Sequence, residues 1–170
     1  MSRRTIFALM AFGAALTTFA RRPDARPLLV WNATASAPLG FYRIAPARPV
    51  RVGDLVLLRP DTAAAALYAA RGYLPLGVPL LKPVAATAGM HVCEHDGRLS
   101  ISGKMLASAQ PADGKGRPLA AWSDCRSLAA GEVFVLNPAV PTSLDGRYFG
   151  PSPLSAVIGR ALPLWTWSGR

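Results

Sequence analysis

Lysine is rare in this chain of 170 residues, and one lysine stands in an unusual place. Arginines occupy all but three of the 19 basic positions, and the lysines are at 82, 104 and 115. Lys82 lies in the apolar run VPLLKPVAA, residues 78–86, where a permanently charged guanidinium would be costly. Because burial lowers the pKa of a lysine, Lys82 can supply a neutral amine as a general base. The other interpretation is a lysine whose stem covers apolar surface while its ammonium reaches water.

A general base needs a nucleophile, and the segment WNATASAPLGFY, residues 31–42, offers a serine. Ser36 stands between two alanines and shortly before Pro38, so a substrate backbone has room to approach and the chain stays extended. Thr34 comes two residues earlier, which places its hydroxyl on the same side as Ser36 in an extended chain. We expect Thr34 and the backbone amide of Ser36 to stabilise an oxyanion. A single loop serine, taken alone, is usually structural.

A third polar segment lies near the C-terminus, in the sequence PTSLDGRYFGP, residues 141–151. Ser143 and Asp145 are two residues apart, so both can face a buried amine, and Arg147 follows on the same side. Such a set can orient a lysine. The alternative is a turn in which Asp145 caps backbone amides and pairs with Arg147.

The chain contains two cysteines, Cys93 and Cys125. In an exported domain they would form a disulfide, whose closed loop contributes roughly 3 to 4 kcal/mol in the chain-entropy model. Two unrelated buried thiols are a second interpretation. A third is a metal site, because His91, Cys93 and His95 would share one face of a strand, with Cys125 as a fourth ligand. We expect no metal and no cofactor, since both histidines flank the turn-like residues 94–97 and are more simply solvated.

The only membrane candidate lies at the N-terminus. Residues 5–20 carry no charge, and arginines stand at positions 3, 4, 21 and 22. The run is shorter than the roughly 20 apolar residues of a spanning helix and longer than the core of a secretory signal. We expect an uncleaved transmembrane helix, because an arginine pair suits an interfacial anchor better than the start of a secreted protein. The expected organisation is an anchor with its basic flank at residues 1–27 and a catalytic β-domain at residues 28–170.

Composition limits the class of the remaining chain. Hydrophobic residues make up 51% and charged residues 16%, which excludes intrinsic disorder. With 15 glycines and 16 prolines the chain is unlike a helical bundle, so we expect a mainly β domain. Of the formal net charge of +10, +7 falls within the first 51 residues. The domain therefore has no extended basic face, and nucleic acid is not expected as a partner.

Short apolar runs between turn residues predict the strands that must position these side chains. The predicted strands are residues 28–31, 40–44, 54–58, 80–84, 91–93, 99–101 and 132–136. One helix is predicted at residues 62–71, with Asp61 as its N-cap and Gly72 as its C-terminal stop. The polar segment 102–124 predicts an exposed ribbon or loop.

Taken together, these segments resemble the conjugal-transfer peptidases of the TraF type, in the signal peptidase I superfamily of Ser/Lys serine peptidases. The resemblance runs to about residue 158 and rests on NATASAPLGFYRI, RGYLPLGVPLLKPV, the two cysteines and SLDGRYFGP. It implies a signal peptidase I-like or LexA-like β-domain. Carried over by position, it makes Ser36 the nucleophile, Lys82 the general base and Thr34 the side-chain oxyanion donor, with Ser143 and Asp145 holding the lysine.

The resemblance also implies a function. We expect a membrane-anchored serine endopeptidase that processes exported proteins, such as a prepilin of a conjugation system, and some members of this type close the product into a ring. The catalytic domain would lie on the periplasmic side of the cytoplasmic membrane. The alternative is an inactive, anchored component of a conjugation or secretion channel. Two positions depart from the signal peptidase pattern: Ala37 replaces the usual Met, and Gly146 replaces the usual Ser.

Overall fold

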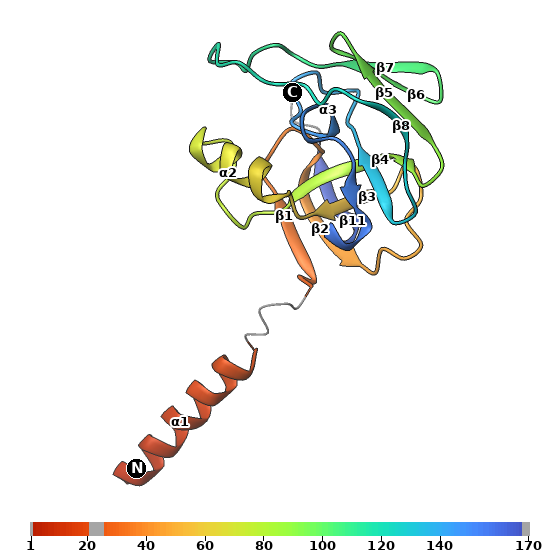
Figure 1. Cartoon of the computed structure of the whole chain (residues 1–170). Helices are drawn as coiled ribbons and strands as arrows, with labels where there is room; N and C mark the ends of the chain where they lie inside the picture. Colours follow the sequence, from red (N-terminus) through yellow and green to blue (C-terminus); the bar gives the residue numbers. More distant parts are fainter. Residues whose placement is uncertain (1, 21–25, 168–170) are drawn as a thin grey trace.

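The chain folds mainly into β-strands (Figure 1). The computed structural model describes residues 2–20 and 26–167. Within those residues, a first helix, α1 (Arg3–Ala20), is followed by a body that contains two antiparallel sheets. The mainly β fold class that the composition predicts is therefore confirmed.

The larger sheet holds both segments that the sequence singles out for catalysis. In the described residues it has seven strands in the order β1-β2-β11-β3-β4-β9-β10. In that order the strands are β1 (Leu29–Asn32), β2 (Leu39–Ala45), β11 (Val157–Trp167), β3 (Leu55–Leu58), β4 (Leu80–Thr87), β9 (Glu132–Val135) and β10 (Ser152–Pro153). Ser36 lies in the turn between β1 and β2, and Lys82 lies on β4 opposite Val56 of β3. One sheet therefore supports the serine and the lysine.

The smaller sheet packs against the far end of β4. Its strands, in spatial order, are β7 (Lys104–Ser108), β6 (Arg98–Ile101), β5 (His91–His95) and β8 (Cys125–Ser127). Val92 and Leu99 from this sheet share a buried cluster with Ala86 of β4 and Phe134 of β9. Removing this apolar surface from water holds the two sheets together.

Helix α2 (Thr62–Ala70) is the helix that the sequence predicts. The carboxylate of Asp61 accepts a hydrogen bond from the amide of Ala64 at 2.8 Å, as an N-cap does. The chain leaves the helix at Gly72 with a φ of +70°, a conformation that favours glycine. The other helical segments, α3 (Gly146–Phe149) and the 3₁₀ turn η1 (Leu154–Ala156), are not predicted by the sequence.

All seven predicted strands are present, as β1 to β6 and β9. The segment 102–124 contains β7 followed by a loop with one isolated bridge between Ala112 and Pro118, in agreement with the predicted ribbon or loop. Strands β8 and β11 escape prediction for local reasons. The first consists of Cys, Arg and Ser, and the second is interrupted by Gly159 and Pro163.

The structure corrects the prediction of a transmembrane helix. Helix α1 forms over the predicted run, but no helix in the described part of the chain is long and apolar enough to cross a membrane. Arg3 and Arg4 occupy its first turn, so the uncharged part of the helix is shorter than the roughly 20 apolar residues that a span requires. Arg21 and Arg22, the other flank of the predicted anchor, lie outside the described residues.

Candidate active site

The turn that carries Ser36 is held from within by the side chain of Asn32. The carboxamide nitrogen of Asn32 donates to the carbonyl oxygens of Thr34, Ala37 and Pro38 at 2.9, 3.1 and 3.0 Å. Asn32 is buried at the end of β1, where such a group needs partners. Ala37 is buried with Leu57 and Leu81, so the next residue after Ser36 anchors the turn in the core. Ser36 itself is half-buried.

Thr34 and Ser36 are hydrogen-bonded to each other, as the sequence predicts for two hydroxyls on one side. Their Oγ1 and Oγ atoms are 3.1 Å apart. Thr34 Oγ1 also donates to the carboxamide oxygen of Asn32 at 2.9 Å. Since a hydroxyl has one proton to donate, the Ser36 hydroxyl is then the donor toward Thr34. In this arrangement Thr34 must release Asn32 before it can donate to an oxyanion.

Lys82 is buried at the start of β4, with 3% of its surface exposed. The two residues before Lys82 are apolar and buried. Leu80 packs with Tyr68 of α2, and Leu81 packs with Leu57 of β3. Lys82 Nζ donates to Ser143 Oγ at 2.7 Å. Burial lowers the pKa of Lys82 from its ordinary value of 10.5 to about 8, while the negative charge of Asp145 partly opposes this and Arg147 adds to it. About a tenth of Lys82 is therefore neutral at pH 7, far more than for an ordinary lysine.

Asp145 and Arg147 form a buried ion pair behind Ser143. Arg147 Nε and Nη2 donate to the two carboxylate oxygens of Asp145 at 2.9 and 3.0 Å, and both side chains are almost fully buried. Arg147 also donates to the carbonyl oxygens of Val140, Pro141 and Ser143. The pair therefore shapes the loop that presents Ser143. Both sequence interpretations hold in part: Ser143 contacts the lysine, whereas Asp145 pairs with Arg147 and caps α3.

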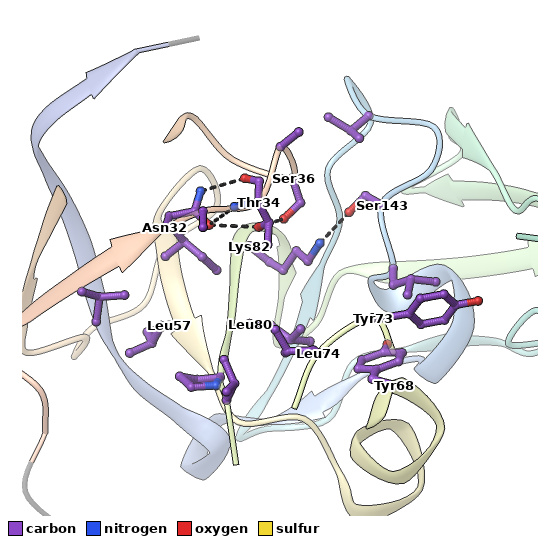
Figure 2. A pocket seen from close by; sticks show the side chains of 18 of the residues that line it. Asn32, Thr34, Ser36, Leu57, Tyr68, Tyr73, Leu74, Leu80, Lys82 and Ser143 are labelled. Atoms are coloured by element: carbon purple, nitrogen blue, oxygen red, sulfur yellow. Dashed lines mark hydrogen bonds between the residues drawn. The ribbon is translucent and has the colours of Figure 1, made fainter. Parts of the chain in front are cut away.

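These side chains meet at one cavity of about 410 Å³ (Figure 2). Its lining includes Thr34 and Ser36 from the turn, Lys82 from β4 and Ser143 from the loop before α3. In the described residues, the hydrogen bond of Lys82 Nζ goes to Ser143 and that of Ser36 Oγ goes to Thr34. Ser36 and Lys82 thus share the cavity without a direct hydrogen bond. Catalytic hydrogen bonds are often loose without substrate and tighten when it binds.

The two departures from the signal peptidase pattern have spatial reasons. Ala37 packs within the buried cluster of Leu57 and Leu81. A Cβ at Gly146 would lie 2.6 Å from the ring of Phe134 and 2.7 Å from the carbonyl oxygen of Val135. A serine at position 146 would therefore force this part of the core apart.

Sequence reasoning missed two residues that hold the nucleophile turn, Asn32 and Asn137. Asn137 Nδ2 donates to the backbone oxygen of Ser36 at 2.6 Å, across 101 residues of sequence. One signal in the sequence was available, because these are the only asparagines in the chain. Each directly follows an apolar run, which fits a polar side chain at the end of a strand.

The two cysteines lie directly opposite one another. Cys93 of β5 pairs in register with Cys125 of β8, and the structure joins them as a disulfide. This closeness agrees with the predicted disulfide and not with two unrelated positions. His91 and His95 are exposed on β5. In the residues that the structure describes, no group of His, Cys, Asp and Glu side chains is arranged to hold a metal.

A family model described as signal peptidase, peptidase S26, matches residues 2–166. The chain belongs to this peptidase family. Its relatives include a conjugal transfer protein TraF of Agrobacterium tumefaciens (strain 15955), 38% identical over 80% of this chain and 81% of the relative. A probable conjugal transfer protein TraF of Sinorhizobium fredii is 36% identical over 81% of this chain and 77% of its own length. A plasmid transfer protein TraF of Escherichia coli is 34% identical over 80% and 82%.

Among solved structures, this S26 chain is similar to a signal peptidase I from Enterococcus faecalis V583. The match has a TM-score of 0.40 and 20% sequence identity, and it covers 68% of this chain and 98% of the other. Family membership makes the protein a serine peptidase at the level of the family. The resemblance to TraF-type peptidases that the sequence motifs predict is confirmed.

Proposed function

We propose that this S26 protein is a serine endopeptidase in which Ser36 is the nucleophile and Lys82 the general base. The observation that carries the proposal is a buried lysine, with a pKa lowered to about 8, in the same cavity as a serine on a tightly held turn. Lys82 already contacts a hydroxyl, that of Ser143, which supports its amine from one side. Asp145 acts on Lys82 by charge and on the loop of Ser143 through Arg147.

The reaction begins when neutral Lys82 takes the proton of the Ser36 hydroxyl. Ser36 Oγ then bonds to the carbonyl carbon of the substrate peptide, and the resulting oxyanion is held by the Ser36 amide and by Thr34 after it turns from Asn32. The C–N bond breaks, and the Lys82 ammonium gives its proton to the leaving amine. Lys82 next takes a proton from water, whose oxygen attacks the ester, and the released Ser36 oxygen recovers that proton.

The substrate of this reaction is an exported protein. The relatives bear the names of conjugal or plasmid transfer proteins, which supports a place in conjugation and a pilin precursor as the substrate. The resemblance to TraF-type peptidases implies small residues before the cleaved bond. If an amine of the substrate replaces water at the second step, the product is a ring. Intact mass separates these outcomes, since linear and ring products differ by one water.

We also propose that the catalytic domain works on the periplasmic side of the cytoplasmic membrane, against the lipid surface. An exposed aromatic cluster supports this location: Trp31, Phe41, Trp165 and Trp167 lie with neighbouring ring centres 4.7 to 5.6 Å apart. Trp165 is 68% exposed, and Trp31 also lines the cavity of Ser36. Tryptophan is favoured at membrane interfaces, so this cluster would keep the cavity near the lipid.

The pairing of Cys93 with Cys125 is the second support for this location, because disulfides persist in oxidising compartments such as the periplasm. A periplasmic location predicts that Cys93 and Cys125, in protein taken from cells, resist alkylation until a reductant is added. Two freely alkylated thiols would contradict a periplasmic location.

The alternative proposal is an inactive component of a conjugation or secretion channel that keeps the peptidase fold. The missing direct hydrogen bond between Ser36 and Lys82 is the observation that favours it. The two proposals differ in whether Ser36 is a nucleophile, and an activated ester of a short acyl-alanine answers that question.

The test treats the full chain with a p-nitrophenyl ester of acetyl-alanine and locates the adduct by peptide mass. The peptidase proposal expects one acyl group on Ser36, and no adduct at that position in Ser36→Ala. A Ser36→Cys variant should regain acylation that is blocked by thiol reagents. A folded chain that stays unmodified at Ser36 would favour the inactive component.

A further inference from the structure

Asn137 touches both sides of the candidate active site. Its side-chain nitrogen donates to the carbonyl oxygen of Ser36 at 2.6 Å. Its backbone N–H donates to Asp145 Oδ2 at 3.1 Å, and its side-chain oxygen accepts the N–H of Ala139 at 3.1 Å. One residue therefore joins the nucleophile turn to the carboxylate behind Ser143.

The orientation of this carboxamide follows from its partners. The Ser36 carbonyl can only accept and the Ala139 amide can only donate, so the nitrogen of Asn137 faces Ser36 and its oxygen faces Ala139. If the amide were flipped, its oxygen would face the carbonyl oxygen of Ser36, and its NH₂ group would face the N–H of Ala139. The contact to Ser36 thus depends on the N–H₂ group of an asparagine, which an isosteric aspartate lacks.

The backbone around Asn137 is fixed from the lysine side. The amide of Leu136 donates to the carbonyl of Pro83 at 3.0 Å, next to Lys82 on β4. The partner of the Asn137 amide, Asp145, is held by the buried guanidinium of Arg147. The backbone of Asn137 is therefore fixed relative to the strand of Lys82 and the loop of Ser143. Its side chain reaches from there to the turn of Ser36.

Three side chains from outside the turn of Ser36 donate hydrogen bonds to its carbonyl oxygens in the described residues, those of Asn32, Asn137 and Tyr42, and the Tyr42 hydroxyl donates to Pro38 at 2.6 Å. Asn32 comes from the same segment and binds the carbonyls of Thr34, Ala37 and Pro38. It shapes the turn but does not place it relative to Lys82. Asn137 comes from the other side and binds the one carbonyl that belongs to Ser36. The burial of Ala37 with Leu81 also fixes the turn, but the hydrogen bond from Asn137 is the one that joins the backbone of Ser36 itself to the lysine side.

We propose that Asn137 is a positioning residue that sets the distance between the hydroxyl of Ser36 and the amine of Lys82. The inference rests on the proposed roles of these two residues. Asn137 acts through Ser36 and not through the substrate, since it is absent from the described residues that line the cavity. A displacement of about 1 Å in a reacting group costs up to about 100-fold in rate, so a lost contact here acts mainly on the chemical step.

The decisive variant is Asn137→Asp, which keeps the acceptor for Ala139 and loses the donor to Ser36. We expect acylation of Ser36 by the acetyl-alanine ester to slow by about 10- to 100-fold per folded molecule, with the fall in kcat and little change in KM. Asn137→Ser gives the same result, because its shorter hydroxyl still accepts from Ala139 but does not reach Ser36. Ala139→Ser is the matched control, since it alters an exposed side chain in the same loop and keeps the N–H; it should react like the parent.

The outcomes separate the inference from the proposed function. If the parent chain is not acylated at Ser36, the peptidase proposal fails, and the positioning role fails with it. If the parent reacts and Asn137→Asp reacts equally fast per folded molecule, the positioning role alone is wrong. Rates are measured below the unfolding midpoint of each variant. A loss that merely follows the fraction of folded protein, or a loss confined to KM, would make Asn137 a structural residue and overturn the inference.

Discussion

The nucleophile side and the lysine side of the cavity are held by different kinds of contacts. Ser36 is half-buried on a turn, and the side chains that support this turn are neutral: the carboxamides of Asn32 and Asn137 and the hydroxyl of Tyr42. Lys82 is buried on a strand, and behind its partner Ser143 lies a buried ion pair. The nucleophile side must admit a substrate backbone, while the lysine side must keep water away from an amine. Neutral hydrogen bonds suit the first need, and burial suits the second.

The largest effect is expected from replacing the base. Lys82→Met keeps an unbranched apolar stem and removes the amine, and Lys82→Arg keeps the charge but cannot lose its proton. In both variants we expect acylation of Ser36 to fall by about 10² to 10⁴-fold, the usual contribution of general-base catalysis. Stopped-flow release of p-nitrophenol measures the rate. Parental rates in both variants would remove Lys82 from the chemistry.

Lys82→Met should lower the acylation rate but raise the free energy of unfolding. Burial lowers the pKa of Lys82 from 10.5 to about 8, so the unfolded chain holds a proton that the folded chain has lost between these pH values. Below about pH 8 this shift costs the folded state about 3 kcal/mol, and the cost disappears as the pH rises to about 10.5. Urea unfolding should therefore show Lys82→Met gaining most over the parent at pH 7 and least near pH 10.5. An equal difference at both pH values would contradict this account.

A second substitution tests the buried ion pair of the lysine side. Arg147→Met leaves the Asp145 carboxylate buried without its partner, and we expect a loss of about 3 to 5 kcal/mol in the free energy of unfolding. The matched control is Arg126→Met, which removes the partly exposed pair with Glu132 and should cost about 1 kcal/mol or less. Urea titrations of both variants measure the difference. Equal losses would show that burial does not distinguish the lysine side.

The smallest effect is expected on the nucleophile side. Asn32→Asp removes the donor to three backbone carbonyls and keeps the acceptor for Thr34. We expect a loss of about 1 to 3 kcal/mol in the free energy of unfolding, because the carbonyls of Thr34 and Ala37 lose this donor, while that of Pro38 keeps the Tyr42 hydroxyl. The acylation rate per folded molecule should also fall. An unchanged unfolding midpoint would mean that the turn does not depend on its carboxamide.

The sequence predicts the parts of the fold in which local pattern and tertiary structure agree. Apolar runs between turn residues predict seven strands, and the Asp61 cap predicts α2. Strand β11 escapes prediction because Pro163 stands within it. Its register shifts between Pro163 and Trp165, and beyond Arg160 it pairs with β2 alone, so the proline breaks no ladder on the other side. The uncharged run at residues 5–20 is of intermediate length: it forms a helix, but none of the described helices is long and apolar enough to cross a membrane.

The residues of the candidate site also fall into those that the sequence predicts and those that only the fold shows. Ser36, Thr34, Lys82 and Ser143 could be predicted from residue type and motif order, and the structure brings all four to one cavity. Asp145 is placed by Arg147, which sequence reasoning offered only as one of two alternatives. Asn32 and Asn137 stand out in the sequence as its only asparagines, but their role could not be read from it, because an asparagine beside a strand usually marks a turn. Their role depends on contacts such as the one between Asn137 and Ser36, which exist only after folding.

The pH dependence of Ser36 acylation in the parent chain tests the central claim most directly. If the neutral amine of Lys82 is the base, the lowered pKa sets the midpoint, so the rate rises with pH, is half-maximal near pH 8 and levels off above it. Below the midpoint the rate falls about tenfold for each pH unit. A rate that stays constant between pH 6 and pH 10, or that rises only near the ordinary lysine pKa, would contradict a buried lysine acting on Ser36.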